Sequence, residues 1–322
     1  MNQRRAFLEW LMIAIWFLKV QRCFQHDRLG LGGNAEENLR HGRSSHEGHK
    51  SKVKEAIRTF GKALLFFIVW ALGISLVFSV YEKPPVIANN KAMLRLYWEA
   101  APLAMVMVCT VLAITYVDKK KVAVTITKRP IRDTALGFVF GIGWVSSVIL
   151  ILKSFGILTF GSSARVSALP IWGLALFLNA AMQELLVRGY LFSIIRRAYS
   201  STVAVIITTG LFIALHGGAF GVSVVAVLNV LTMSIFVSLL LLWTEGLWAS
   251  IVVHYIWNMV AGVAINGIVL AGDYPNILQI SLHGASLFTG GAAKIEGSIV
   301  TLGVNLVLIG MTAFMLRRKY QS

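Results

Sequence analysis

The sequence has 322 residues, of which 57% are hydrophobic and 14% are charged, and several apolar segments reach the length of about 20 residues that a membrane-spanning helix needs. This composition excludes an ordinary soluble domain. The net charge of +16 comes mainly from the N-terminal segment, one loop and the C-terminus, which is typical of cytoplasmic faces beside anionic membrane lipids and argues against nucleic acid as a partner.

Residues 1–56 differ from the rest of the chain and are expected to form a basic, polar N-terminal extension. Residues 6–18 are mostly apolar but contain Glu9, and no small-residue cleavage site follows, so an interfacial helix is expected rather than a cleaved signal peptide. The segment 21–54 is polar, and its histidines lack regular ligand spacing, which predicts a solvated flexible tail. Residues 57–322 form the predicted transmembrane domain.

The apolar segments of this domain predict an all-α, polytopic transmembrane helical bundle of about eight spans. They cover residues 61–80, 100–117, 134–155, 169–195, 201–216, 220–243, 247–268 and 297–316. Basic residues cluster in the loop 118–133, after the fourth span and after the eighth, whereas the loops 156–168 and 269–296 hold one each. With both termini cytoplasmic, every basic cluster falls on the cytoplasmic face of the cell membrane, as the positive-inside rule expects.

The fourth predicted span carries a polar insertion that contains Gln183, Glu184 and Arg188. A charged residue at bilayer depth costs roughly 2.5–3.5 kcal/mol on insertion scales, unless it is paired or functional. Glu184 and Arg188 are four residues apart, so on a helix they share a face and can pair. A structural ion pair would account for them, but the membrane setting favours a functional site.

Two later apolar segments carry His216, and His254 with Asn258 four residues further on. A carboxylate or imidazole could deprotonate a water, and a His or Asn side chain could stabilise an oxyanion. Alternatively, Glu184, His216 and His254 could hold a divalent metal such as zinc, although no HExxH motif is present. Taken singly, each histidine could be structural, as a helix cap or as an interhelical hydrogen-bonding group. Together with Glu184 they predict a site.

Three motifs carry a resemblance to a known family. Gln183-Glu184-x-x-x-Arg188-Gly189, Phe212-x-x-x-His216 and His254-x-x-x-Asn258 resemble the motifs of the CPBP family, which contains CAAX-processing endoproteases and bacteriocin-processing or immunity-associated proteins. The resemblance covers residues 175–265, inside a core of about 170–268. It implies an intramembrane endopeptidase whose first motif usually begins with two glutamates, the first of which activates water together with the second-motif histidine. It also implies that His254 and Asn258 lie on the oxyanion or metal side.

Gln183 departs from this pattern because an amide orients a water but does not take its proton. Our first hypothesis is an endopeptidase that acts on a membrane-associated peptide, either CAAX-like and prenylated or a bacteriocin-like precursor. In it Glu184 supplies the carboxylate, held by Arg188, and His216 is a base or ligand; the metal requirement stays open. The second hypothesis is a non-catalytic membrane protein with an immunity or partner-binding role, disarmed by Gln183. A transporter is the third.

Overall fold

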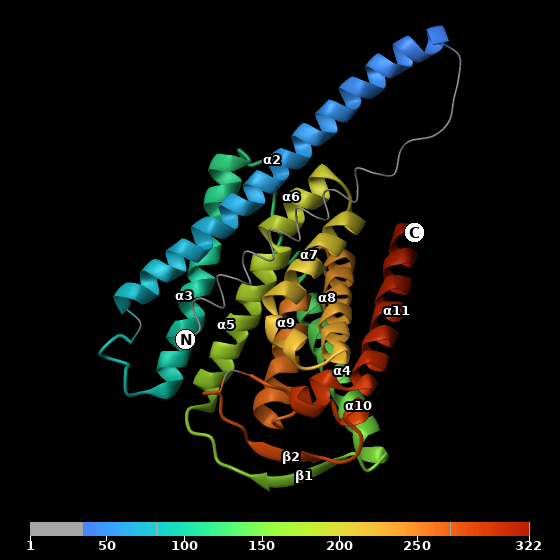
Figure 1. Cartoon of the computed structure of the whole chain (residues 1–322). Helices are drawn as coiled ribbons and strands as arrows, with labels where there is room; N and C mark the ends of the chain where they lie inside the picture. Colours follow the sequence, from blue (N-terminus) through green and yellow to red (C-terminus); the bar gives the residue numbers. More distant parts are fainter. Residues whose placement is uncertain (1–34, 82, 271, 322) are drawn as a thin grey trace. The chain divides into compact units, whose positions relative to one another are not determined.

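The computed structural model describes residues 35–81, 83–270 and 272–321, which are almost entirely helical (Figure 1). The elements in chain order are α2 (Ala35–Tyr81), α3 (Lys91–Leu112), the π-helix η1 (Ala113–Val117), α4 (Pro130–Ser154), β1 (Leu158–Ser163), α5 (Leu169–Arg188), α6 (Tyr190–Ala198), α7 (Ser201–Leu215), the 3-10 helix η2 (Gly217–Gly221), α8 (Val224–Thr244), α9 (Trp248–Ile256), the π-helix η3 (Trp257–Ala264), β2 (Leu278–Leu282), α10 (Ser286–Thr289), the 3-10 helix η4 (Gly291–Gly297) and α11 (Ile299–Gln321).

The predicted helical membrane bundle is confirmed, and six of the eight predicted spans correspond to helices long enough to cross a membrane. Six helical stretches among the described residues are long and apolar enough to cross a membrane, so the chain is a multi-pass membrane protein. They are Lys54–Tyr81, Lys91–Val117, Pro130–Ser154, Leu169–Ala198, Val224–Thr244 and Gly291–Gln321. The remaining two predicted spans are the shorter apolar helices Ser201–Leu215 and Trp248–Ala264. A helix of about 15 residues rises only about 22 Å, less than the hydrocarbon thickness of about 30 Å.

The N-terminal part departs from the sequence-based prediction. Helix α2 begins at Ala35, so the backbone of residues 35–54 is helical where a flexible tail was predicted. The predicted interfacial helix at residues 6–18 lies outside the described residues. The chain divides into two compact units, residues 1–64 and residues 65–322, and the second unit contains every predicted site residue.

Close packing between α4 and α9 determines where the third motif lies. A Cβ atom added to Gly137 would lie 2.6 Å from Val252 Cβ, and one added to Gly141 would lie 2.9 Å from Ile256 Cβ. Small residues four apart allow two membrane helices to approach this closely. One turn further along, Trp144 stacks on Trp257 with ring centroids 4.0 Å apart. Helix α9 is therefore fixed against α4 on both sides of His254.

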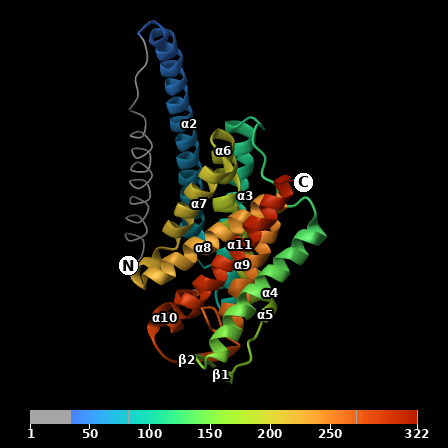
Figure 2. The same cartoon turned by 90° about the vertical axis from the view of Figure 1, so that its right-hand side faces the viewer.

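A small sheet, which the sequence analysis did not predict, lies at one end of the bundle (Figures 1 and 2). Strands β1 and β2 pair antiparallel, with Leu158 opposite Leu282 and Phe160 opposite Ile280. The sheet joins the segment that follows α4 to the segment that follows η3. The interior of the bundle is formed by helices.

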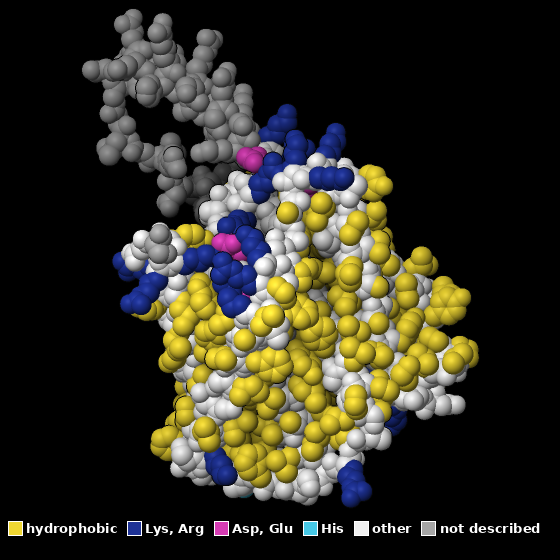
Figure 3. Space-filling view, turned by 180° about the vertical axis from the view of Figure 1, so that it is seen from behind, with side chains coloured by type: hydrophobic (Ala, Val, Ile, Leu, Met, Phe, Trp, Pro, Cys, Tyr) yellow, Lys and Arg dark blue, Asp and Glu magenta, His cyan; other side chains and the backbone are white. Residues whose placement is uncertain are grey.

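The surface separates apolar from basic residues (Figure 3). Hydrophobic side chains cover a broad band of the bundle, and Lys and Arg side chains gather mainly at one end. Large exposed hydrophobic side chains on the membrane-length helices include Val139 and Leu150 on α4 and Val307 on α11. An apolar band with a basic rim is the surface expected of a protein surrounded by lipid tails and headgroups.

Candidate active site

Glu184 and Arg188 form a completely buried ion pair on the last turn of α5. The Arg188 guanidinium donates to Glu184 Oε2 over 2.8 Å, and neither side chain is exposed to solvent. This confirms the pairing predicted from their spacing of four residues. A buried ion pair persists only when the remaining hydrogen-bonding capacity of both partners is also used.

Helix α8 accepts the other hydrogen bonds of Arg188, and α7 contributes an aromatic ring. Its Nε donates to Ser238 Oγ at 2.9 Å, and its second terminal nitrogen donates to Ser234 Oγ at 2.5 Å and to the Ser234 carbonyl at 3.1 Å. The guanidinium also lies over the Phe212 ring, 4.8 Å from its centroid. Arg188 thus connects α5, α7 and α8 and fixes the carboxylate of Glu184 between them.

Gly189, the glycine of the first motif, separates α5 from α6. Its backbone has φ −79° and ψ −108°, outside the helical region. A Cβ atom at this position would lie 2.2 Å from the Leu185 carbonyl oxygen, far inside contact distance. Only glycine fits there, and the chain can therefore turn directly after Arg188.

His254 on α9 contacts the second carboxylate oxygen of Glu184. The distance between His254 Nδ1 and Glu184 Oε1 is 2.9 Å, and His254 is buried. Both carboxylate oxygens of Glu184 are thus engaged, one by Arg188 and one by His254. A carboxylate in this position orients the imidazole and can compensate a positive charge on it.

His216 caps the C-terminal end of α7 and meets the same cluster. Its Nδ1 lies 2.8 Å from the Phe212 carbonyl oxygen, and its ring centroid lies 4.2 Å from that of Phe212. The same Phe212 ring lies 6.1 Å from the His254 ring, and the Arg188 guanidinium lies 4.8 Å from its centroid, so Phe212 contacts both His216 and the ion-paired cluster. The 3-10 helix η2 follows at once, so α7 ends at the depth of the site.

The hydrogen bonds of the two histidines determine which ring nitrogen is left for chemistry. The Phe212 carbonyl can only accept, so Nδ1 of His216 carries the hydrogen, and in the neutral ring Nε2 keeps its lone pair. Glu184 likewise engages Nδ1 of His254 and leaves Nε2 as the outward nitrogen. The site therefore offers two oriented imidazoles beside one buried carboxylate.

Asn258 follows His254 in the third motif and lies at the start of the π-helix η3. It is 8% exposed, and its side chain makes no hydrogen bond to any residue that the structure describes. A buried amide normally has a hydrogen-bonding partner. Its Nδ2 group is thus a donor that a bound substrate oxygen could satisfy.

Gln183 belongs to a second polar chain, which the sequence analysis missed. Its Nε2 donates to Asn179 Oδ1 at 2.7 Å, and Asn179 Nδ2 donates to Glu99 Oε2 on α3 at 2.8 Å. Glu99 is buried and pairs with Arg95. Glu99 precedes the predicted span 100–117 by one residue, but α3 begins at Lys91, so Glu99 lies inside the bundle. Its spacing of four from Arg95, just before an apolar run, was the signal available in the sequence.

The predicted metal ligands do not fit a metal centre. Within the described part of the chain, no three His, Cys, Asp or Glu side chains are grouped so that they could hold a metal ion. Both oxygens of Glu184 are already engaged by Arg188 and His254.

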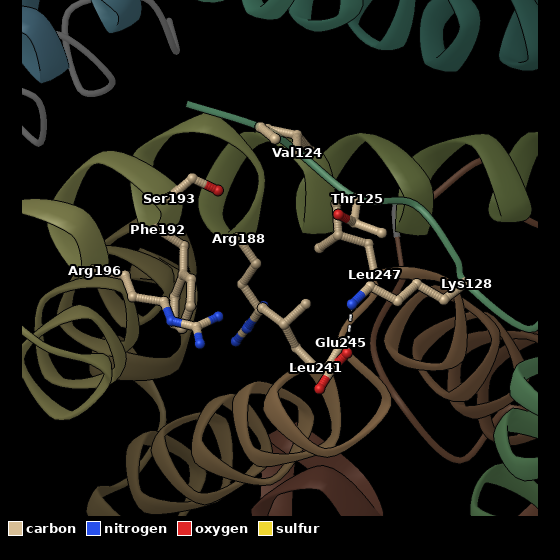
Figure 4. A pocket seen from close by; sticks show the side chains of 11 residues that line it. Val124, Thr125, Lys128, Arg188, Phe192, Ser193, Arg196, Leu241, Glu245 and Leu247 are labelled. Atoms are coloured by element: carbon tan, nitrogen blue, oxygen red, sulfur yellow. Dashed lines mark hydrogen bonds and ion pairs between the residues drawn. The ribbon is translucent and has the colours of Figure 1, made fainter. Parts of the chain in front are cut away.

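A cavity of about 320 Å³ lies against Arg188 (Figure 4). It is enclosed by the non-helical segment 123–128, the α5–α6 junction and the C-terminal end of α8. Its charged lining includes Arg196, Lys128 and Glu245, and a dashed contact joins the last two in the figure. Lys128 Nζ lies 2.5 Å from Glu245 Oε2. The cavity thus has a polar, mainly basic wall next to the buried ion pair.

Comparison with known proteins identifies one family. Residues 165–260 match the model described as type II CAAX prenyl endopeptidase Rce1-like. The matched segment contains all three motifs, which confirms the resemblance inferred from them. Neither a search of curated proteins nor a search of solved structures found a match to the chain.

Proposed function

Because the segment 165–260 belongs to the Rce1-like family of type II CAAX prenyl endopeptidases, we propose that this protein hydrolyses a peptide bond in a prenylated, membrane-anchored substrate. The observation that carries the proposal is the convergence of the three motifs. Glu184 contacts His254 directly, and the Phe212 ring lies beside both His216 and His254, so side chains from α5, α7 and α9 come together. Scattered structural polar residues would not be expected to converge in this way.

We assign the proton transfer to His216. Its Nδ1 is committed to the Phe212 carbonyl, so Nε2 accepts a proton from the attacking water. Both oxygens of Glu184 are engaged, one by Arg188 and one by His254. Glu184 therefore serves as a fixed negative charge beside these groups and does not act as the base. The proton then passes from Nε2 to the leaving amine when the tetrahedral intermediate collapses.

We assign oxyanion stabilisation to His254 and Asn258. This role requires a hydrogen on His254 Nε2, and the Glu184 carboxylate, 2.9 Å from Nδ1, is placed to compensate the charge of the ring in the reaction. The unpaired Nδ2 group of Asn258 supplies a second donor. Donors fixed before the reaction stabilise a developing oxyanion more than mobile water does, and the loss of one typically costs about 10²–10³-fold in turnover.

The basic cavity beside Arg188 fits the polar end of such a substrate. A CAAX-type peptide ends in a free carboxylate, and Arg196 and Lys128 line the cavity. The prenyl group would remain in the lipid beside the apolar band of the bundle. Entry from the basic face agrees with the cytoplasmic orientation that the loop charges predict.

A non-catalytic, partner-binding role is the second candidate, and Gln183 is the observation that favours it. An amide at this position has no useful basicity, so a scaffold that keeps the cluster without turnover would tolerate it. Under this reading the protein binds a membrane partner, and the buried cluster only stabilises the bundle.

A cleavage assay separates the two candidates. Purified protein in lipid vesicles is incubated with a prenylated CAAX peptide, the same peptide without the prenyl group and a bacteriocin-like leader peptide, with and without a chelator. The proposal predicts cleavage of the prenylated peptide that survives the chelator and is lost in His216→Ala. No cleavage by wild type under conditions where Gln183→Glu cleaves would favour the non-catalytic role.

A further inference from the structure

Glu99, Asn179 and Gln183 form a hydrogen-bond network in which each amide donates toward Glu99, and Glu99 determines this direction of donation. Glu99 lies on α3, outside the three motifs, and is only 4% exposed. Arg95 and the Tyr274 hydroxyl, the latter at 3.4 Å, both approach Glu99 Oε1. Arg95 also contacts Asp273 at 3.3 Å. The carboxylate is thus fixed at one end by a cation and presents Oε2 to α5.

Hydrogen-bond polarity then passes from residue to residue. A carboxylate only accepts, so Asn179 must turn its Nδ2 group to Glu99, which leaves Oδ1 for Gln183. Gln183 must in turn present Nε2 to Asn179. The Gln183 carbonyl Oε1 is the group left over, and no described residue donates to it.

We infer that Glu99 is a positioning residue of the site: acting through Asn179, it fixes the Gln183 amide so that Oε1, and not Nε2, is free to accept a hydrogen bond. The inference rests on the proposed peptidase function, because the natural donor to Oε1 is the attacking water. Gln183 then orients the water while His216 takes its proton. Glu99 supplies from another helix the negative charge that the first motif lacks at position 183.

The same chain explains why glutamine fits at position 183. A glutamate there would leave Asn179 between two carboxylates, with its Oδ1 facing one of them. An asparagine side chain has a single NH₂ group and cannot turn it toward both neighbours. Two carboxylates that share such a site repel each other, and one of them must bind a proton or move away. Gln183 and Glu99 are therefore a matched pair.

Replacement of Glu99 by glutamine should reverse the donors and acceptors along the Glu99–Asn179–Gln183 hydrogen-bond network. In Glu99→Gln the Arg95 guanidinium retains the carbonyl oxygen of residue 99, and the new amide nitrogen turns to Asn179. Asn179 flips, Gln183 flips, and its free group becomes the donor Nε2. In the double variant Glu99→Gln/Gln183→Glu the reversed chain ends on a carboxylate and is again fully matched.

A double-mutant cycle in lipid vesicles tests this. Wild type, Glu99→Gln, Gln183→Glu and the double variant are compared by melting temperature and by kcat and KM for the prenylated peptide. Asp133→Asn is the control, because it alters a buried carboxylate that is not part of the Glu99–Asn179–Gln183 hydrogen-bond network. We expect the double variant to melt about 3 °C or more above Gln183→Glu. We expect Glu99→Gln to lower kcat about tenfold or more at nearly constant KM, as a misdirected group does. The double variant should regain that kcat.

Additive melting temperatures would overturn the inference, and so would an unchanged kcat in Glu99→Gln when wild type is active. If wild type cleaves no peptide, the proposed peptidase function fails, while the thermal cycle still decides whether Glu99 governs the Gln183 amide. A loss of kcat in Asp133→Asn equal to that in Glu99→Gln would show that any buried carboxylate has this effect, which also contradicts a positioning role.

Discussion

The carboxylate of Glu184 lies 2.9 Å from Nδ1 of His254, across the interface between α5 and α9, while its other oxygen accepts from Arg188 at 2.8 Å on its own helix. This one side chain therefore joins the first motif to the third. Because Arg188 in turn contacts Ser234 and Ser238 on α8, removal of the carboxylate affects three helices.

Replacement of Glu184 by alanine should destabilise the bundle strongly. It leaves the buried Arg188 guanidinium without its counter-charge, and loss of one partner of a buried ion pair costs about 3–5 kcal/mol. The double variant Glu184→Ala/Arg188→Met removes both charges and should be more stable than Glu184→Ala. Melting temperature in detergent measures both. A double variant that melts below the single variant would contradict the account of the pair.

His216→Ala should separate chemistry from folding. Among the residues that the structure describes, the His216 side chain hydrogen-bonds only to a backbone carbonyl of its own helix, so its loss should change the melting temperature little. Loss of a general base lowers turnover by about 10²–10⁴-fold. His283→Ala, at an exposed histidine beside β1 that contacts Thr159, is the matched control and should keep full activity. Equal rates for the two variants would remove His216 from the mechanism.

Gly189→Ala should damage the α5–α6 junction. The added Cβ would lie 2.2 Å from the Leu185 carbonyl, so the backbone after Arg188 must move. The clash is with backbone, which cannot move aside as a flexible side chain can, so we expect a clear loss of melting temperature. The test is the melting temperature beside that of Gly143→Ala, where a Cβ atom meets nothing within 4 Å. Similar values for the two variants would show that the junction accommodates a side chain.

Glu245 at the end of α8 gives a pH-dependent prediction outside the spans. Hydrogen bonds and ion pairs with Lys128 and Lys319 lower the pKa of Glu245 to about 2. A depressed pKa stabilises the fold above the ordinary value of 4.5, and that stabilisation is lost as the pH falls toward 2. Because the group is largely exposed, the contribution should stay below about 1 kcal/mol.

The corresponding measurement compares the melting temperatures of wild type and Glu245→Gln at pH 7 and pH 3. The difference should be larger at pH 7 and should shrink in high salt, because exposed ion pairs are screened. A difference that grows on acidification would contradict the assigned ion pairs.

The sequence predicted much of this molecule because membranes impose strong rules on composition. Apolar runs gave the helices, and the spacing of Glu184 and Arg188 gave the ion pair. The polar network through Glu99 and Asn179 could not be predicted, because it depends on how α3 packs against α5. The short α7 was predicted as a span because it is apolar, although a helix of about 15 residues is shorter than the hydrocarbon core.

The role of His254 also needed three-dimensional information. From sequence, it was a candidate for oxyanion or metal binding, and its pairing with Glu184 was not foreseen. These two residues, 70 positions apart, meet because α5 packs against α9, while Gly137 and Gly141 let α4 approach α9 closely. Long-range contacts of this kind depend on packing rather than on local pattern.

The central claim is that this cluster hydrolyses a peptide bond with His216 as the base. It is tested most directly by the cleavage rate of one prenylated CAAX peptide, measured by mass spectrometry for wild type and His216→Ala in the same vesicles. The account predicts cleavage by wild type and a loss of at least about 10²-fold in the variant at an unchanged melting temperature. Cleavage at equal rates, or none by either protein, would contradict it.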